Sequence, residues 1–256
     1  MKLLKILGGL VVLLVLVLLV VGFFIDGIAQ SAIETAATEA LGVSTTVDSC
    51  HVGLLRGTFR MEGLKVANPK GYGDAPFLRL RSGGIEVAAA TLADEKVEVP
   101  EFTLDGIRLG LIQNAQGSNY GTILDNLDRF GKSDASTEGE GKRFVIKKLV
   151  ITDVVVSVVP VPELKLGALD LPLERIELTD VGSDTEKGVL LSELSSIVVQ
   201  EILQRATSSG QLPAMIQGAL GGKLGSLKGA VESEARKHLD NAKKDVTNRL
   251  KGLLGK

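Results

Sequence analysis

The chain has 256 residues, of which 45% are hydrophobic, and its 29 Lys and Arg residues nearly balance its 31 Asp and Glu residues, giving a formal net charge of -2. This balance excludes the strongly basic surface with which proteins normally bind nucleic acid. The hydrophobic content excludes general disorder, and the single cysteine, Cys50, excludes an intramolecular disulfide.

The chain begins with an apolar run from Ile6 to Ile25 that contains no charged residue. At about 1.5 Å per helical residue, this run is long enough to cross the ~30 Å hydrocarbon core of a bilayer. We therefore predict a transmembrane anchor at residues 1–26. The alternative is a cleavable signal peptide, because Gly27-Ile28-Ala29 is an acceptable cleavage site, but signal peptides usually carry an apolar stretch of only about 7 to 15 residues.

The charges on the two sides of this run predict its orientation. Lys2 and Lys5 precede the run and Asp26 follows it. Under the positive-inside rule the N-terminus stays in the cytoplasm, so the body of the protein lies on the other side of the membrane.

Residues 27–130 read as a β-rich region with two helices. Helical spacing of apolar residues predicts a helix from Ala29 to Leu41, and alternation with a period of two begins at Thr45. A short helix is expected from Gly121 to Phe130. The polar, Gly/Ser-rich stretch 131–142 follows and is predicted to be a linker.

An internal repeat lies on the two sides of this linker. The segment from Val97 to Leu111 aligns without a gap on the segment from Phe144 to Val158, which belongs to a second β repeat at residues 143–187. All apolar positions match, so each copy is predicted to present one apolar face that lines either a groove or a core. The predicted lining residues are Val97, Val99, Phe102, Leu104, Ile107, Leu109, Leu111, Phe144, Ile146, Leu149, Ile151, Val154, Val156 and Val158.

Both copies change the phase of their alternation twice. One change falls at Pro100-Glu101 and at Lys147-Lys148, and the other falls at Asp105-Gly106 and at Thr152-Asp153. A strand that changes phase keeps one apolar face only if it has a bulge or a tight bend, so we predict such a distortion at each place.

The C-terminal region, residues 188–256, is predicted to be helical. Apolar residues recur at helical spacing from Leu191 to Ala206 and again from Leu224 to Leu253. The second helix is amphipathic and carries an excess of Lys and Arg, which suits an anionic lipid surface, but its narrow apolar stripe equally suits packing on the protein's own sheet, the interpretation we favour.

Enzyme motifs are missing from the sequence, which predicts no catalytic residue, metal site or cofactor. Cys50 and His51 are adjacent, but neighbours on a strand point to opposite faces and cannot readily share a proton. Asp105, Asp153 and Asp180 follow strand segments, where aspartate more commonly caps its own backbone than binds a metal ion.

Several segments resemble the N-terminal region of AsmA-like proteins. They are Gly53–Gly57, Gly63–Tyr72, Pro76–Leu78, Leu104–Gly106 and Gly117–Tyr120. The resemblance covers roughly residues 1–130 and is looser beyond them.

The resemblance implies a protein anchored in the inner membrane of a diderm bacterium, with a periplasmic body and a curved β-sheet whose inner face forms an apolar groove. Long members of the family are regarded as phospholipid conduits between the two envelope membranes. With about eight to ten strands at ~4.8 Å each, a groove in this chain would run only about 40 to 50 Å, too short to bridge an envelope alone.

The sequence therefore predicts an α+β fold with an N-terminal transmembrane helix, a curved, mainly antiparallel sheet with an apolar inner face, and C-terminal amphipathic helices. The predicted function is non-catalytic, in envelope lipid homeostasis or transport or in outer-membrane assembly. Its expected partners are the bilayer, phospholipid acyl chains and other envelope proteins, without nucleic acid. The alternative is an interaction scaffold whose sheet is filled by its own helices and binds no lipid, and an enzyme ranks third.

Overall fold

The computed structural model describes residues 24–53, 56–91, 94–114, 117–136, 143–159, 169–183, 188–189, 191–214, 216–222 and 224–225. The chain divides into two compact units, residues 1–199 and residues 200–256. The predicted anchor up to residue 23 and the tail from residue 226 lie outside the described residues. None of the helices in the described part is both long and apolar enough to span a membrane.

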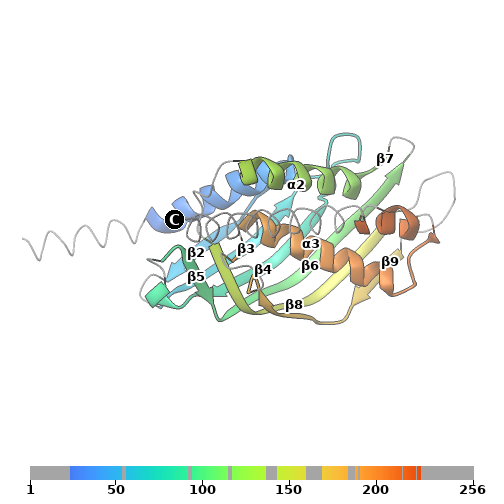
Figure 1. The fold of residues 1–256 in the computed structure, drawn as a ribbon. Coiled ribbons are helices and arrows are strands. Elements are labelled where there is room, and N and C mark those ends of the chain that lie inside the picture. Colours follow the sequence, from blue (N-terminus) through green and yellow to red (C-terminus); the bar gives the residue numbers. More distant parts are fainter. Residues whose placement is uncertain are drawn as a thin grey trace, which may run out of the picture. The chain divides into compact units, whose positions relative to one another are not determined.

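A ten-stranded, open, curved sheet dominates the first unit (Figure 1). Its central path runs in the order β1-β3-β4-β6-β8-β10, and β2, β5, β7 and β9 pair beside this path. The strands are β1 (Thr45–Thr46), β2 (Ser49–Gly53), β3 (Thr58–Val66), β4 (Leu78–Glu86), β5 (Lys96–Val99), β6 (Glu101–Asn114), β7 (Gly117–Ser118), β8 (Arg143–Val159), β9 (Leu169–Leu173) and β10 (Ile176–Val181).

Most neighbouring strands are antiparallel, as predicted, but β8 runs parallel to β5 and β6. Parallel strands need a long crossover connection, and α2 (Asn119–Ser136) lies in the segment that joins β6 to β8. It lies against β6 and β7 (Figure 1) and buries Tyr120, Ile123 and Leu124. The prediction of a mainly antiparallel sheet is therefore confirmed, whereas the parallel pairing of β8 with β5 and β6 was not predicted.

Helix α2 also overlaps the segment 131–142 that was predicted to be a linker. The helix continues past Phe130 as far as Ser136, so the first half of that segment is helical, and residues 137–142 lie outside the described residues. The physical reason is that one glycine costs a helix only about 1 kcal/mol, whereas extending an existing helix is favourable once its first turn has formed.

Three further helical segments are described. One spans residues 24–41, where a helix was expected from Ala29 to Leu41. Helix α3 (Leu191–Ser208) crosses the boundary between the two units and buries Leu194, Val198, Ile202 and Ala206, which belong to the predicted stripe. The last segment lies within residues 214–225 of the second unit. A 3-10 turn, η1 (Ala89–Thr91), precedes β5.

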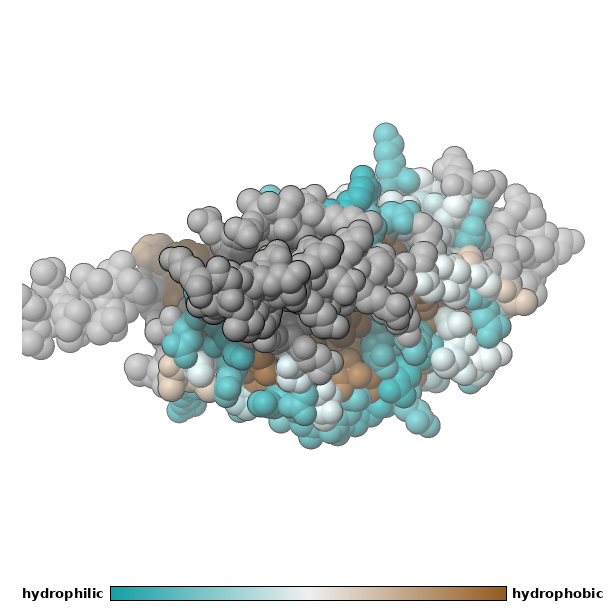
Figure 2. All heavy atoms as spheres, in the orientation of Figure 1, coloured by the Kyte–Doolittle hydropathy of each residue, from teal (hydrophilic) through white to brown (hydrophobic). Residues whose placement is uncertain are grey.

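The sheet has one apolar and one polar face. In Figure 2 the coloured atoms along the lower edge are mostly hydrophilic, and patches of hydrophobic atoms are visible just above them. On β6 the residues Phe102, Leu104, Ile107 and Leu109 are buried, whereas Arg108 between them is exposed. This pattern is that of a strand with one buried side and one solvated side.

Candidate functional site: the apolar face and the kink row

The two copies of the sequence repeat lie side by side in the sheet. Val97 pairs with Phe144 in the β5–β8 ladder, and Leu104 pairs with Ile151 in the β6–β8 ladder. Every further pair in these two ladders has the same sequence separation, so the register equals the gap-free alignment. The two copies therefore occupy equivalent places in neighbouring strands of one sheet.

The apolar residues of both copies are buried. Of the predicted lining residues only Phe144 is half-buried. The buried ones are Val97, Val99, Phe102, Leu104, Ile107, Leu109, Leu111, Ile146, Leu149, Ile151, Val154, Val156 and Val158. These side chains form one apolar surface across β5, β6 and β8.

A row of positions that the strand ladders skip crosses the sheet through this surface, and we call Gly63, Arg81, Gly106 and Asp153 the kink row. Gly63 stands opposite Arg81, Arg81 opposite Gly106, and Gly106 opposite Asp153, and these are the positions that the otherwise continuous registers skip. The φ angles of Gly63, Gly106 and Asp153 are 67, 76 and 51 degrees. The distortion predicted at Asp105-Gly106 and at Thr152-Asp153 is confirmed.

The kink row explains how the apolar face stays continuous. A phase change in a single strand would turn its apolar residues to the wrong face. Here neighbouring strands change phase at the same level, so Leu80 and Gly83 of β4 are buried on either side of Arg81, as Leu104 and Ile107 of β6 are beside Gly106. The registers therefore agree on both sides of the row.

The other predicted phase change is a break in the first copy. Strand β5 ends at Val99 and β6 begins at Glu101, so Pro100 interrupts the pairing with β8 opposite Lys147. On the other side of β8, Asp180 has a φ of 54 degrees and is skipped in the register of β10. Strand β8 itself runs without interruption through Lys147 and Lys148, and the left-handed residue at this level is Asp180 of β10.

Charged side chains connect three strands on the polar face of the kink row. Arg81 Nε donates to Asp105 Oδ2 at 3.0 Å, and Arg81 Nη1 lies 3.1 Å from Asp153 Oδ2. Arg108 Nη2 donates to Asp153 Oδ1 at 2.9 Å, and the Thr152 hydroxyl donates to Asp105 Oδ1 at 2.7 Å. The hydrogen bond from Arg81, and then that from Thr152, lowers the pKa of the Asp105 carboxyl.

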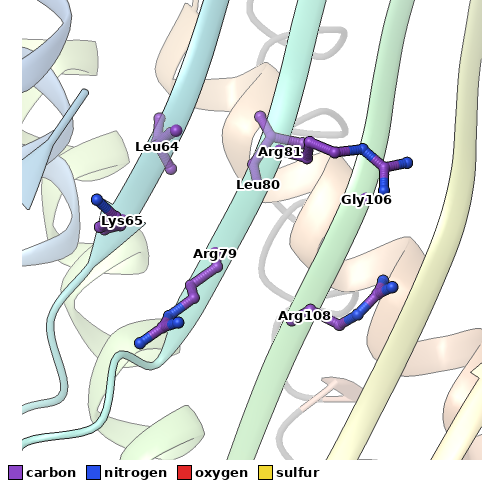
Figure 3. A pocket seen from close by; sticks show the side chains of 8 residues that line it. Leu64, Lys65, Arg79, Leu80, Arg81, Gly106 and Arg108 are labelled. Carbon is purple, nitrogen blue, oxygen red and sulfur yellow. The ribbon is translucent and has the colours of Figure 1, made fainter. Parts of the chain in front are cut away.

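A shallow pocket of about 280 Å³ opens beside this network (Figure 3). Lys65, Arg79, Arg81 and Arg108 line it, and Figure 3 shows their side chains along three adjacent strands. Lys65 is bound to Asp48, and Arg81 and Arg108 share the two carboxylates described above. Because most of its positive charge is already paired, the pocket does not make a strong anion site.

The turn motifs that carry the family resemblance are joined at one end of the sheet. Asn119, which has no exposed surface, donates from Nδ2 to Asn68 Oδ1 and to the Gly110 carbonyl, both at 2.8 Å. Its Oδ1 accepts from the backbone N–H of Ile112. Asn68 in turn donates to the Tyr72 and Ala75 carbonyls. These motif residues tie the β3–β4 connection to the start of α2, which is a structural role.

The side chains with catalytic or metal-binding chemistry at Cys50, His51 and the three aspartates are held apart or already paired. Cys50 is buried, which raises the pKa of its thiol, whereas the neighbouring His51 side chain is 76% exposed. Asp180 lies 3.6 Å from Lys147 Nζ, and Asp105 and Asp153 bind arginines. Among the residues that the structure describes, no group of His, Cys, Asp and Glu side chains could hold a metal ion.

No protein-family model and no curated protein matches this chain. Sequence reasoning found the apolar face but missed the charged network, although Asp105 and Asp153 each stand at a phase change and Arg81 and Arg108 occupy polar positions of alternating strands. A phase change that coincides with a carboxylate in both copies was the available signal.

Proposed function

We propose that this chain is a membrane-anchored, non-catalytic, AsmA-like protein of the bacterial envelope, whose sheet presents its apolar face to phospholipid acyl chains. Its role is envelope lipid homeostasis or transport, or the assembly of outer-membrane proteins. The anchor is the apolar run at residues 6–25, which places the N-terminus in the cytoplasm and the body in the periplasm.

The observation that carries the proposal is the continuity of the apolar face. Two neighbouring strands carry apolar residues at the same positions in register, and the kink row keeps these residues on one face. In the uninterrupted second copy, from Phe144 to Val158, the face extends along about 50 Å of β8. One leaflet of a ~30 Å hydrocarbon core is about 15 Å thick, so this length exceeds what one acyl chain needs.

A second candidate is a scaffold whose sheet is filled by the protein itself. The observation that favours it is the near-complete burial of Leu111, Ile151 and Val156, each with 0% exposed surface. A surface already covered within the chain does not need a lipid to shield it from water. For lipid carriage, whatever covers this face must move aside when the acyl chain enters.

Photocrosslinking in intact cells separates the two candidates. A photoreactive amino acid replaces Leu104 or Leu109 on the apolar face, and the matched control carries it at Arg108, on the polar face of the same strand. Lipid carriage predicts phospholipid adducts from positions 104 and 109 and none from position 108. Crosslinks that join these positions only to other segments of the chain would reject lipid carriage and leave the scaffold.

The membrane topology has its own test. A retained anchor predicts that protease added to spheroplasts digests the body, while the protein isolated from intact cells keeps its original N-terminus. A mature N-terminus at Gln30 would show that residues 1–29 act as a signal peptide and would overturn the anchor.

A further inference from the structure

The helix at residues 24–41 is bound to the edge of the sheet by four polar side chains spaced four residues apart. Asp26 Oδ1 accepts from the backbone N–H of Val52 at 2.7 Å, and Gln30 Nε2 donates to the Val47 carbonyl at 2.7 Å. Glu34 Oε1 accepts from the Val47 N–H at 2.7 Å, and Thr38 Oγ1 accepts from the Thr45 N–H at 3.0 Å. We call Asp26, Gln30, Glu34 and Thr38 the ladder.

The ladder takes the place of a neighbouring strand. Strands β1 and β2 form one interrupted edge strand, because both pair with β3 in the same register. An edge strand presents unpaired backbone N–H and C=O groups, and side chains spaced four residues apart lie along one face of a helix. The ladder therefore fixes the helix lengthwise along the edge, from the end of β2 to the start of β1.

The far end of the helix is fixed as well. Asn126 Nδ2 of α2 donates to the Leu41 carbonyl at 2.6 Å. Gly42 has a φ of 67 degrees, and a Cβ there would lie 2.4 Å from Asn126 Nδ2, so glycine allows the two helices to approach closely. The helix is thus held at several points along its length and has a defined direction relative to the strands.

Little chain separates the ladder from the predicted membrane span. The apolar run ends at Ile25 and the first ladder residue is Asp26, and both lie within the helix. Phe24 and Ile28, at the same end, are 61% and 66% exposed. An anchor that continues directly into a docked helix transmits its own orientation to the sheet, because no flexible linker lies between them.

We infer that the ladder makes the helix at 24–41 a rigid strut that holds the sheet in one orientation over the bilayer, with the β2–β3 turn toward the lipid surface. This inference rests on the proposed membrane anchorage. The membrane-facing end then carries Val52, Phe59 and Ile85, which share one level of the sheet. The β3–β4 connection faces away, about 30 Å further along β3.

Lipid-to-label quenching tests this orientation in the full-length protein. The protein with Cys50→Ala is reconstituted into phosphatidylcholine vesicles that contain a headgroup-nitroxide lipid, and a fluorophore is attached at Arg56→Cys or at Lys70→Cys. Both positions are exposed, and they lie in the β2–β3 turn and in the β3–β4 connection. We expect several-fold stronger quenching at position 56 than at position 70. Equal quenching of the two labels would overturn the inference without any further variant.

The ladder is tested by Gln30→Ala with Glu34→Ala in the same two labelled proteins. This pair should bring the quenching ratio close to one, whereas Thr35→Ala with Glu39→Ala, at exposed positions of the same helix, should leave it unchanged. A folded ladder variant that keeps the original ratio contradicts the strut, and the single variant Gln30→Ala serves if the pair does not fold. If the reconstituted protein does not float with the vesicles, the membrane anchorage itself is refuted. The absence of lipid adducts in the photocrosslinking experiment, by contrast, rejects lipid carriage alone.

Discussion

Gly106 and Asp153 stand opposite each other in neighbouring parallel strands, and both adopt a left-handed backbone conformation, with φ angles of 76 and 51 degrees. They are equivalent positions of the two repeat copies. Glycine adopts this conformation without strain, and aspartate is one of the few other residues that tolerate it. The pair shows that the two copies share a backbone distortion as well as an apolar pattern.

The first prediction concerns the left-handed glycine of this pair. Gly106→Ala should lower the free energy of unfolding by about 1–3 kcal/mol, because the residue has a positive φ and its Cβ would lie 2.6 Å from Arg81 Cβ. Gly110→Ala in the same strand is the control, since the nearest atom to its Cβ is 3.6 Å away. It should change stability by less than about 0.5 kcal/mol. Urea unfolding of both variants checks the difference, and equal effects would contradict the kink row.

The second prediction concerns the assigned faces of β6. Leu109→Asp buries an unpaired carboxylate at a position with 1% exposed surface and should destabilise the protein by about 3 kcal/mol or more. Arg108→Gln, on the opposite face, removes an exposed ion pair and should cost less than about 1 kcal/mol. Thermal or urea unfolding compares them, and similar losses would mean that the faces are assigned wrongly.

The third prediction concerns acid sensitivity through Asp105. Arg81 and Thr152 lower its pKa in the folded protein below the ordinary 3.8. The stability contributed by the ionised carboxyl is therefore complete above about pH 4 and is lost as the pH falls through the lowered pKa. Asp105→Asn should be less stable than the wild type at pH 7, and the difference should shrink below about pH 4.

A double-mutant comparison isolates the cause of that effect. In an Arg81→Gln background, Asp105→Asn should change the pH dependence of unfolding much less, because the arginine that does most to lower the pKa of this carboxyl has been removed. An unchanged pH dependence in the two backgrounds would assign the effect to groups other than this pair. Urea unfolding at a series of pH values gives the required free energies.

The fourth prediction concerns the turn motifs. Asn119→Ala leaves the Ile112 N–H and the Gly110 carbonyl without their side-chain partner in a buried place, so it should cost about 2 kcal/mol or more. Thr122→Ala, on the same helix, removes one hydrogen bond from a half-buried hydroxyl to the Ser118 carbonyl and should cost about 1 kcal/mol or less. Hydrogen exchange of the amides near Ile112 would show the local loss directly.

The sequence determined much of the sheet by itself. Alternation with a period of two depends on local chemistry, so it located the strand segments, the apolar faces and the phase changes at Gly106 and Asp153. The gap-free alignment of the repeat also matches the register between β6 and β8, where equivalent residues pair and the two phase changes stand at the same level.

The tertiary structure decided how these elements combine. Alternation does not specify strand direction, so the parallel pairing of β6 with β8 was not predicted. The extension of α2 to Ser136 was missed as well, because the Gly/Ser-rich composition of that segment suggested a linker. The Arg81–Asp105 pair and the contact of Gln30 with Val47 join residues that are distant along the chain. Such contacts depend on which strands become neighbours and which strand forms the edge of the sheet. A local sequence pattern carries no information about either.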